Sequence, residues 1–241
     1  MMKRLSRKDI ELISLKIINE YKKLPEIAGR NLYRIDPVLL CEKVLKLNVD
    51  FAHLSLDGTV LGLTSFTELG IEVFESDDED TYYCLDGKTV LIESELKNNI
   101  AMKGRYNFTV AHEASHQIFK MMFPMEYGVT HNENRIHFYK PENKRSKYIT
   151  DWEEWQANTL ASYLLLPNEL LIQAMRLFDL PSHIRMISKL YNPDIYQRFV
   201  AMADFLGCSQ SALSIRLKQL GIIEKEYSYV PFSSLDVEVD W

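Results

Sequence analysis

The pattern His-Glu-x-x-His at residues 112–116 constrains this 241-residue chain more than any other feature of its sequence. Residues four apart on an α-helix lie one above the other on the same face, separated by about 6 Å along the axis. His112 and His116 can therefore reach one metal ion together, and imidazole nitrogens bind Zn²⁺ at about 2.0–2.1 Å. Glu113 projects about 100° further round the helix, where a carboxylate can act as a general base beside the metal without binding it. A pattern with three fixed positions also arises by chance, so it needs support from the rest of the chain.

The residues around this pattern favour a helix. Apolar side chains occur at mixed helical spacings through residues 105–119, and Pro124 bounds the segment. The sequence therefore predicts that the two histidines share one face of a helix. The apolar positions are Phe108, Val110, Ala111, Ile118 and Phe119.

A second segment, residues 150–167, carries the third candidate ligand. Thr150 and Glu153 have the spacing of a capping box, in which the threonine hydroxyl accepts a backbone N–H and the glutamate reaches back to the cap. Because the cap uses Glu153, Glu154 is the better candidate metal ligand. Asn158, one turn later, is placed to accept the ring N–H of a ligating histidine. The alternative for Glu154 is a solvated carboxylate on the helix surface, as most glutamates are, although the apolar run that follows favours a half-buried position.

Together the two segments resemble the ImmA/IrrE family of zinc metallopeptidases. That family pairs an FTxAHExxH helix, preceded by an arginine, with a downstream ExxANxxAxxLLxP helix, and the resemblance covers residues 1–170 of this chain. The matching residues are Arg105, Phe108, Thr109, Ala111, His112, Glu113, His116, Glu154, Ala157, Asn158, Ala161, Leu164, Leu165 and Pro167.

The resemblance implies that His112, His116 and Glu154 bind Zn²⁺ and that Glu113 is the catalytic carboxylate. Members of the family occur typically in bacteria and their mobile elements, where they cleave a helix-turn-helix repressor or inactivate it by other means. The expected partner is therefore a protein substrate, a transcriptional repressor of a stress response or of a mobile element.

This chain departs from the family pattern at two places. Ala114 and Ser115 stand where the family usually has Leu-Gly, and Lys120 stands where it commonly has a histidine four residues after the second ligand. Neither change removes a ligand. We expect the loss of the glycine to alter the packing beside the metal.

Composition and charge fit a globular protein of the cytoplasm. The net charge of −6 gives no overall attraction to nucleic acid. The three cysteines, Cys41, Cys84 and Cys208, are far apart and odd in number, which is typical of reduced thiols and not of a disulfide framework. No apolar run approaches the length of a membrane span, and the N-terminus lacks the uninterrupted apolar core of a signal peptide. We therefore expect no association with membranes.

The chain before the histidine helix begins with helices and continues with strands. Residues 6–22 have the spacing of an amphipathic helix with Ser6 as N-cap, and a second helix is predicted from Asp36-Pro37 to about Leu47. The dipeptides Asp57-Gly58 and Asp86-Gly87 are typical of hairpins. The predicted strands are 50–53, 60–66, 71–74, 82–85 and 89–93.

Two features of this strand-rich region bear on function. The acidic run at residues 76–80 lacks the glycine and distal glutamate of a calcium loop, so a solvated loop tip is the favoured interpretation. The strand at 89–93 precedes the metal helix. If it lies at a sheet edge beside the site, an extended peptide substrate can add to it as a further strand.

Residues 125–149, between the two metal helices, are rich in His, Asn, Tyr and Lys. One polar side chain here, or Arg105, can stabilise the oxyanion that forms when water attacks a carbonyl. Ordinary surface positions explain each of them equally well, and the choice stays open. The candidates in the segment are His131, His137, Tyr139 and Tyr148.

The chain after Pro167 is predicted to be helical, with helices at 168–178, 181–190, 194–206 and 209–220. The last two have the outline of a helix-turn-helix, with Ser209 as N-cap and Gly221 at the C-terminal end. If the pair binds DNA, Arg216 and Lys218 are the exposed basic residues of its second helix. Such a patch is thin for phosphate contacts, so packing or partner docking is favoured over DNA binding.

These observations lead to one predicted architecture: an α+β chain with a zincin-like metallopeptidase core at residues 1–170, built on a small, mostly antiparallel sheet. A helical C-terminal region follows at 171–225, and an acidic tail at 226–241. The predicted function is zinc-dependent cleavage of a specific intracellular protein. The alternatives are a metal-binding anti-repressor without peptidase activity and a DNA-binding regulator in which the zinc fold is structural.

Overall fold

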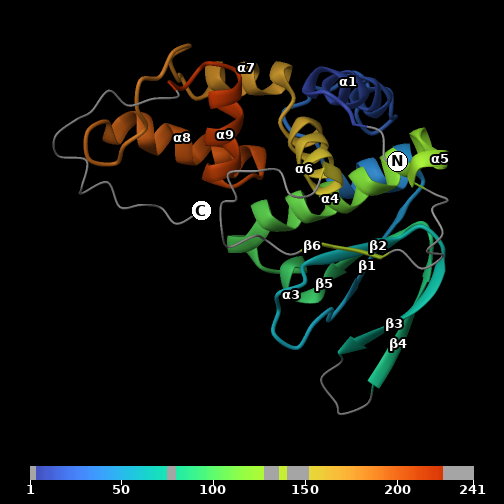
Figure 1. The fold of residues 1–241 in the computed structure, drawn as a ribbon. Coiled ribbons are helices and arrows are strands. Elements are labelled where there is room, and N and C mark those ends of the chain that lie inside the picture. Colours follow the sequence, from blue (N-terminus) through green and yellow to red (C-terminus); the bar gives the residue numbers. More distant parts are fainter. Residues whose placement is uncertain (1–3, 75–79, 128–135, 140–151, 225–241) are drawn as a thin grey trace.

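The computed structural model describes residues 4–74, 80–127, 136–139 and 152–224 of the chain. These residues form an α+β fold in which helices lie over one face of a small sheet (Figure 1). Within the described ranges, no helix combines the length and the apolar character needed to cross a membrane. The predicted acidic tail at 226–241 and most of the acidic run at 76–80 lie outside the described residues.

The long helix α4, Lys103–Met122, occupies the centre of the fold and contains the whole histidine pattern. One of its faces packs on the sheet, and helix α6, Trp152–Leu165, lies on the other side of it (Figure 1). Residues 109–119 of α4 are all buried because the helix is covered from both sides. The chain leaves the helix at Phe123, before Pro124, where the short helix α5 (Pro124–Tyr127) begins.

The main sheet has four strands in the order β1 (Asn48–Ala52), β5 (Thr89–Glu93), β2 (Gly62–Ser65) and β6 (Ile136–Tyr139). Strands β1 and β5 run parallel, and the other two pairings are antiparallel. Strand β5 is interior and hydrogen-bonded on both sides, so the condition for adding a peptide strand to residues 89–93, a position at the sheet edge, is not met. Its five buried residues explain this position, because interior strands read as continuous apolar runs.

A second, two-stranded sheet pairs β3 (Glu68–Phe74) with β4 (Asp80–Asp86) and extends away from the helices (Figure 1). The glycines of both predicted hairpin dipeptides do form turns, with φ of +63° at Gly58 and +74° at Gly87. The predicted hairpin pairings, of β1 with β2 and of β4 with β5, are wrong. Strand β5 lies between β1 and β2, and β4 and β5 belong to different sheets. A turn dipeptide reverses the chain locally and does not decide which strands pair.

The N-terminal helices follow the prediction closely. Helix α1 spans Arg7–Lys22, and Ser6 forms a capping box with Asp9. Asp36 caps α2 (Pro37–Leu39), which continues as the π-helix η1 (Leu40–Leu45). The helix ends at Leu45, two residues earlier than predicted, because the left-handed backbone of Lys46 (φ +57°) stops it. Apolar residues of α1 and α6 share one buried cluster that includes Ile10, Ile13, Leu160 and Leu164.

Three C-terminal helices, α7 (Asn168–Leu177), α8 (Pro193–Leu206) and α9 (Gln210–Gln219), agree with the prediction. The predicted helix at 181–190 is wrong: that segment is irregular. The backbone N–H of Ile184 donates to Ile222 and its carbonyl accepts from Glu224, so its backbone groups pair with the segment that follows α9 instead of within a helix. Short elements α3 (Ser94–Lys97) and η2 (Ile100–Met102) lead into α4.

The turn between α8 and α9 packs against the first half of α4. Gly207 takes a left-handed φ of +68°, and its carbonyl accepts a hydrogen bond from the Asn107 side chain at 2.8 Å. A side chain at Gly104 would place its Cβ 2.7 Å from the backbone nitrogen of Ser209. The helix-turn-helix-like pair is therefore fitted closely onto the helix that carries the histidines.

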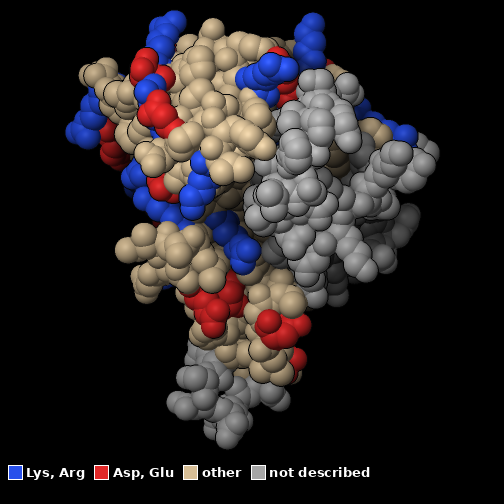
Figure 2. Space-filling model, turned by 90° about the vertical axis from the view of Figure 1, so that its left-hand side faces the viewer, with Lys and Arg blue, Asp and Glu red and all other residues tan. Residues whose placement is uncertain are grey.

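The structure corrects the prediction that Arg216 is an exposed basic residue of α9. Its side chain is only 3% exposed, and it donates to the carbonyl of Leu166 and to the Asn168 side chain. It lies three residues after the buried Leu213, on the face of α9 that packs inward. On the side of the molecule that carries the C-terminal helices, basic residues lie interspersed with acidic and uncharged ones (Figure 2). Lys218 is half-buried.

Candidate metal centre

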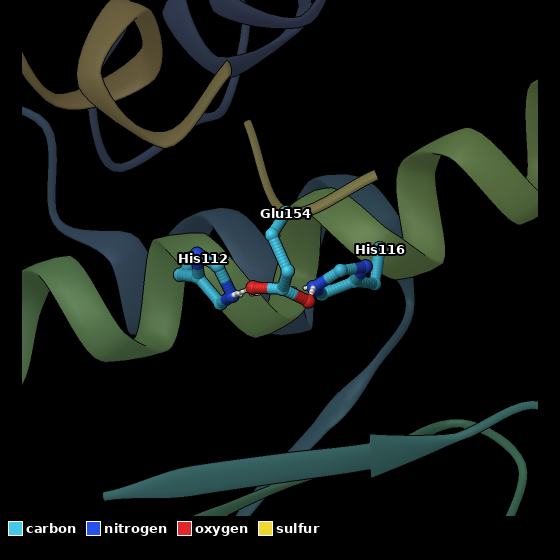
Figure 3. Close-up of side chains that lie close together, drawn as sticks. All are labelled: His112, His116 and Glu154. Atoms are coloured by element: carbon cyan, nitrogen blue, oxygen red, sulfur yellow. Dashed lines mark hydrogen bonds and ion pairs between the residues drawn. The ribbon is translucent and has the colours of Figure 1, made fainter. Parts of the chain in front are cut away.

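Helices α4 and α6 bring His112, His116 and Glu154 together as three candidate ligands. The Nε2 atoms of the two histidines lie 3.2 Å apart. One carboxylate oxygen of Glu154 lies 3.2 Å from the Nε2 of His112, and the other lies 3.2 Å from the Nε2 of His116. The carboxylate points between the two imidazole rings (Figure 3). Both histidines are buried, whereas the Glu154 side chain is 34% exposed, so the cluster is open on the side of α6.

This geometry fits a tetrahedral zinc site. Four ligands at about 2.05 Å from a zinc ion are separated from one another by about 3.3 Å. The two Nε2 atoms here are 3.2 Å apart, each Nε2 lies 3.2 Å from one oxygen of Glu154, and one donor atom from each residue lies within 4.8 Å of the others. Two imidazoles and one carboxylate form a ligand set used by catalytic zinc, which leaves the fourth position for water or substrate. The residues present therefore fit the metal that the sequence predicts.

Asn158 sets the orientation of the first histidine, as predicted. The Nδ1 of His112 lies 3.1 Å from the Oδ1 of Asn158, one turn beyond Glu154 on α6. A carboxamide oxygen only accepts hydrogen bonds, so the proton of this imidazole is on Nδ1. The lone pair of Nε2 then points at the cluster, which is the arrangement that metal-binding histidines require.

Glu113 lies on the side of α4 that faces the sheet, and it is fully buried. Burial raises the pKa of its carboxyl well above the ordinary value of 4.5, and the negative charge of Glu154 raises that pKa further. The backbone N–H of Tyr139 acts in the opposite direction. A carboxylate held in an apolar setting beside a metal is a stronger base than one in water, which suits proton abstraction.

Of the candidate oxyanion-stabilising residues, Tyr139 is placed beside the cluster. Its ring centroid lies 4.4 Å from that of His112, and Phe108 packs against both rings. Burial and the charge of Glu113 raise the pKa of Tyr139 to about 12, against the influence of Arg105. Its phenol therefore stays protonated at neutral pH and can donate a hydrogen bond.

For the other candidate oxyanion-stabilising residues, the described part of the structure gives no side-chain contact with the donor cluster. Arg105 is exposed on the first turn of α4, although its charge is felt at Tyr139. Strand β6 includes His137, whose side chain lies outside what the structure describes, as do the residues His131 and Tyr148. The predicted capping residue Thr150 is also outside the described residues, while its predicted partner Glu153 is buried on α6.

The two departures from the family pattern leave the cluster intact. Ala114 and Ser115 are both buried, and the Ser115 hydroxyl donates to the backbone carbonyl of Ala111, at 2.7 Å within the same helix. The Lys120 ammonium donates to the carbonyls of Phe66 and Gly87. It thus ties the end of α4 to the turns beside β2 and takes no part in the cluster.

One residue beside the site was not predicted. Gly62 of β2 faces Thr109 and Glu113: a Cβ at position 62 would lie 2.6 Å from the Thr109 methyl group and 3.1 Å from the Cγ of Glu113. A glycine at the start of a buried strand signals a close approach of backbone to another group, but the sequence does not show which group approaches.

A comparison with models of known protein families and a comparison with curated proteins both found no match for this chain.

Proposed function

We propose that this chain is a zinc-dependent metalloendopeptidase, in which His112, His116 and Glu154 hold the metal. The observation that carries the proposal is the convergence of two imidazole nitrogens and one carboxylate, with the two Nε2 atoms 3.2 Å apart and each of them 3.2 Å from one oxygen of Glu154. A divalent ion satisfies both nitrogens and the carboxylate at once.

The chain's own residues supply the rest of the reaction. Zinc, when bound, acidifies water and polarises the scissile carbonyl. Glu113 accepts the proton of the attacking water and passes it to the leaving amine. The neutral phenol of Tyr139 donates a hydrogen bond to the oxygen on which negative charge develops. The Asn158 carboxamide keeps His112 in the tautomer that binds metal.

The proposed substrate is a specific protein, namely a helix-turn-helix repressor of a stress response or a mobile element. This part of the proposal is supported by the resemblance of the two motifs to the ImmA/IrrE family. Cleavage of the repressor in the cytoplasm would then relieve repression.

The test compares protein N-termini in cells that express the wild-type chain, Glu113→Gln or Glu95→Gln. The last is a matched control, because Glu95 is an exposed carboxylate on α3, outside the donor cluster. We expect a new internal N-terminus within a DNA-binding repressor in the wild-type and Glu95→Gln cells only. Removing a catalytic proton acceptor lowers the rate by about 10²–10⁴-fold.

Two other outcomes identify the alternatives. Relief of repression by Glu113→Gln at the wild-type level, with zinc retained, would assign the chain as a non-proteolytic anti-repressor. A salt-dependent DNA mobility shift that Lys218→Ala weakens would assign it as a DNA-binding regulator. Arg216→Ala is not suitable for that test, because Arg216 is buried and its loss would disturb the fold.

A further inference from the structure

Gly62 lies in β2 directly opposite Tyr139 of β6. Opposed residues of an antiparallel pair point to the same face of the sheet, and this face is the one covered by α4. A Cβ built at position 62 would lie 2.6 Å from the Cγ2 of Thr109, 3.1 Å from the Cγ of Glu113 and 3.3 Å from its Oε1. Thr109 and Glu113 are one turn apart on α4, so both face the same point of the strand.

The surroundings leave little freedom to relieve such contacts. On the strand side, the backbone of Leu61 donates to Tyr139 and accepts from Glu93. On the helix side, the Gln117 side chain donates to the hydroxyl of Thr64 and the carbonyl of Ser65, both at 2.7 Å. These hydrogen bonds hold α4 against β2 at Gln117, which lies one helical turn beyond Glu113.

The two side chains that meet position 62 are also held in place. The Thr109 hydroxyl donates to the carbonyl of Arg105, which fixes the direction of its methyl group. Glu113 is fully buried between the helix and the sheet. An added methyl group must therefore displace the Thr109 methyl group or push α4 away from β2, and it also presses on the Glu113 side chain at 3.1–3.3 Å.

We infer that Gly62 is a positioning residue for Glu113: the absence of a side chain at 62 creates the space in which the Glu113 carboxylate lies beside the metal ligands. The catalytic meaning of that space rests on the proposed function, but the contact itself does not. A substitution at Gly62 should therefore act through Glu113 and leave the three donor atoms in place.

A stability cycle on the metal-free protein tests the contact without reference to activity. Gly62→Ala, Glu113→Ala and the double variant are compared by thermal unfolding, with Gly70→Ala as the matched strand-glycine control, since nothing lies within 4 Å of a Cβ at position 70. We expect Gly62→Ala to lower Tm by about 4–8 °C, which is typical of overpacking in a chain of this size. The loss should be smaller in the Glu113→Ala background, where the contact with the Thr109 methyl group remains and the contacts with Glu113 are removed. Equal losses in both backgrounds would overturn the inference.

Thr109→Ser separates the effect on Glu113 from general crowding. It removes the methyl group that makes the closest contact and keeps the hydroxyl that bonds to Arg105. If Gly62→Ala does not fold alone, the same cycle is measured in this background, where only the contacts to Glu113 remain. If Thr109→Ser/Gly62→Ala recovers both the stability and the cleavage rate of Thr109→Ser, position 62 serves packing alone. That result would overturn the inference.

Zinc binding and cleavage give two further readouts. Competition with a chromogenic zinc chelator should give Thr109→Ser/Gly62→Ala an affinity within about threefold of Thr109→Ser, because the donor cluster is untouched. With the repressor found by the N-terminal comparison, kcat should fall at least about tenfold with KM unchanged, as expected for a misplaced reacting group. A large loss of zinc affinity would place the effect on the ligands and contradict the inference. If the wild type cleaves nothing, the proposed function fails, and the stability cycle still decides the contact.

Discussion

The Nδ1 atom of His112 lies 3.1 Å from the side-chain oxygen of Asn158, and this contact fixes which nitrogen of the imidazole faces the metal cluster. The two residues belong to different helices, α4 and α6, and are 46 positions apart in the sequence. The contact therefore joins the histidine helix to the helix that supplies Glu154, in addition to setting the tautomer.

Replacing Asn158 should weaken zinc binding without unfolding the chain. We expect Asn158→Ala to raise the zinc Kd by about 10–100-fold, because partners of metal-binding histidines contribute that much to affinity. Asn158→Asp retains an acceptor for the Nδ1 proton and should stay closer to the wild type. Chelator competition provides the affinities, and circular dichroism checks the fold. Equal affinities for wild type and Asn158→Ala would show that the contact has no part in metal binding.

Arg216 should contribute to stability and not to DNA binding. Its guanidinium donates to Leu166, Asn168 and Gln219 and lies 4.1 Å from the ring centroid of Tyr163. Arg216→Ala leaves these acceptors without a donor, so we expect a loss of about 3 kcal/mol in the free energy of unfolding. Chemical denaturation measures this loss. Lys218→Ala is the control, because Lys218 is a half-buried residue of the same helix. Similar small losses for both variants would contradict this structural role.

The metal-free protein should lose stability as the pH rises, because of Glu113. Its pKa is raised in the folded state, so the folded protein binds a proton that the unfolded chain releases near pH 4.5. Stability from this group is complete below that pH and declines as the pH rises towards the folded pKa. Glu113→Gln removes the part of the pH dependence of stability that comes from this carboxyl group. It should raise Tm at pH 7 by about 2–4 °C or more, the shift that about 1 kcal/mol produces.

Thermal unfolding of chelator-treated samples from pH 4 to pH 8 provides the comparison for Glu113→Gln. The difference between variant and wild type should grow with pH. Curves that stay parallel over the whole range would mean that Glu113 ionises normally, against the burial seen here. Glu95→Gln again serves as the control, because its carboxylate is exposed.

The three cysteines should differ sharply in reactivity. Cys84 is exposed, whereas Cys41 and Cys208 are buried. Burial raises the pKa of Cys208 to about 12, and it raises the pKa of Cys41 at least as much. Neither residue therefore forms the reactive thiolate at pH 8. A chromogenic disulfide reagent should titrate about one thiol per native chain and three after denaturation. Cys84→Ser should abolish the native signal, and rapid labelling of a second thiol would contradict the packing around α8 or η1.

Much of the local structure follows from sequence patterns alone. Ser6 and Asp36 cap helices where their positions predict, and His112, His116 and Glu154 meet because the four-residue spacing fixes two of them on one face. What the sequence could not show depends on contacts between distant segments. Strand order is one case: a buried run at 89–93 is compatible with several neighbours, and only the assembled sheet places it between β1 and β2.

Two residues illustrate the same limit at the level of side chains. Arg216 looks like a surface cation in the sequence, but its side chain donates to the carbonyl of Leu166, just after α6 and 50 residues away. Gly62 is an ordinary member of the predicted strand 60–66 in the sequence, but in the fold its missing side chain leaves the space taken by Thr109 and Glu113 of α4. Neither relationship has a local signal, since both partners are chosen by the packing of the whole chain.

The metal content of the purified protein tests the central claim most directly. It is measured by mass spectrometry on the wild type, on His112→Ala and Glu154→Ala, and on Glu95→Gln as a control, after reconstitution with Zn²⁺. We expect about one zinc per chain in the wild type and the control, and its loss or severe weakening in the two ligand variants. A wild-type protein that takes up no zinc, or zinc that is indifferent to both ligand substitutions, would contradict the assignment of His112, His116 and Glu154 as a metal centre.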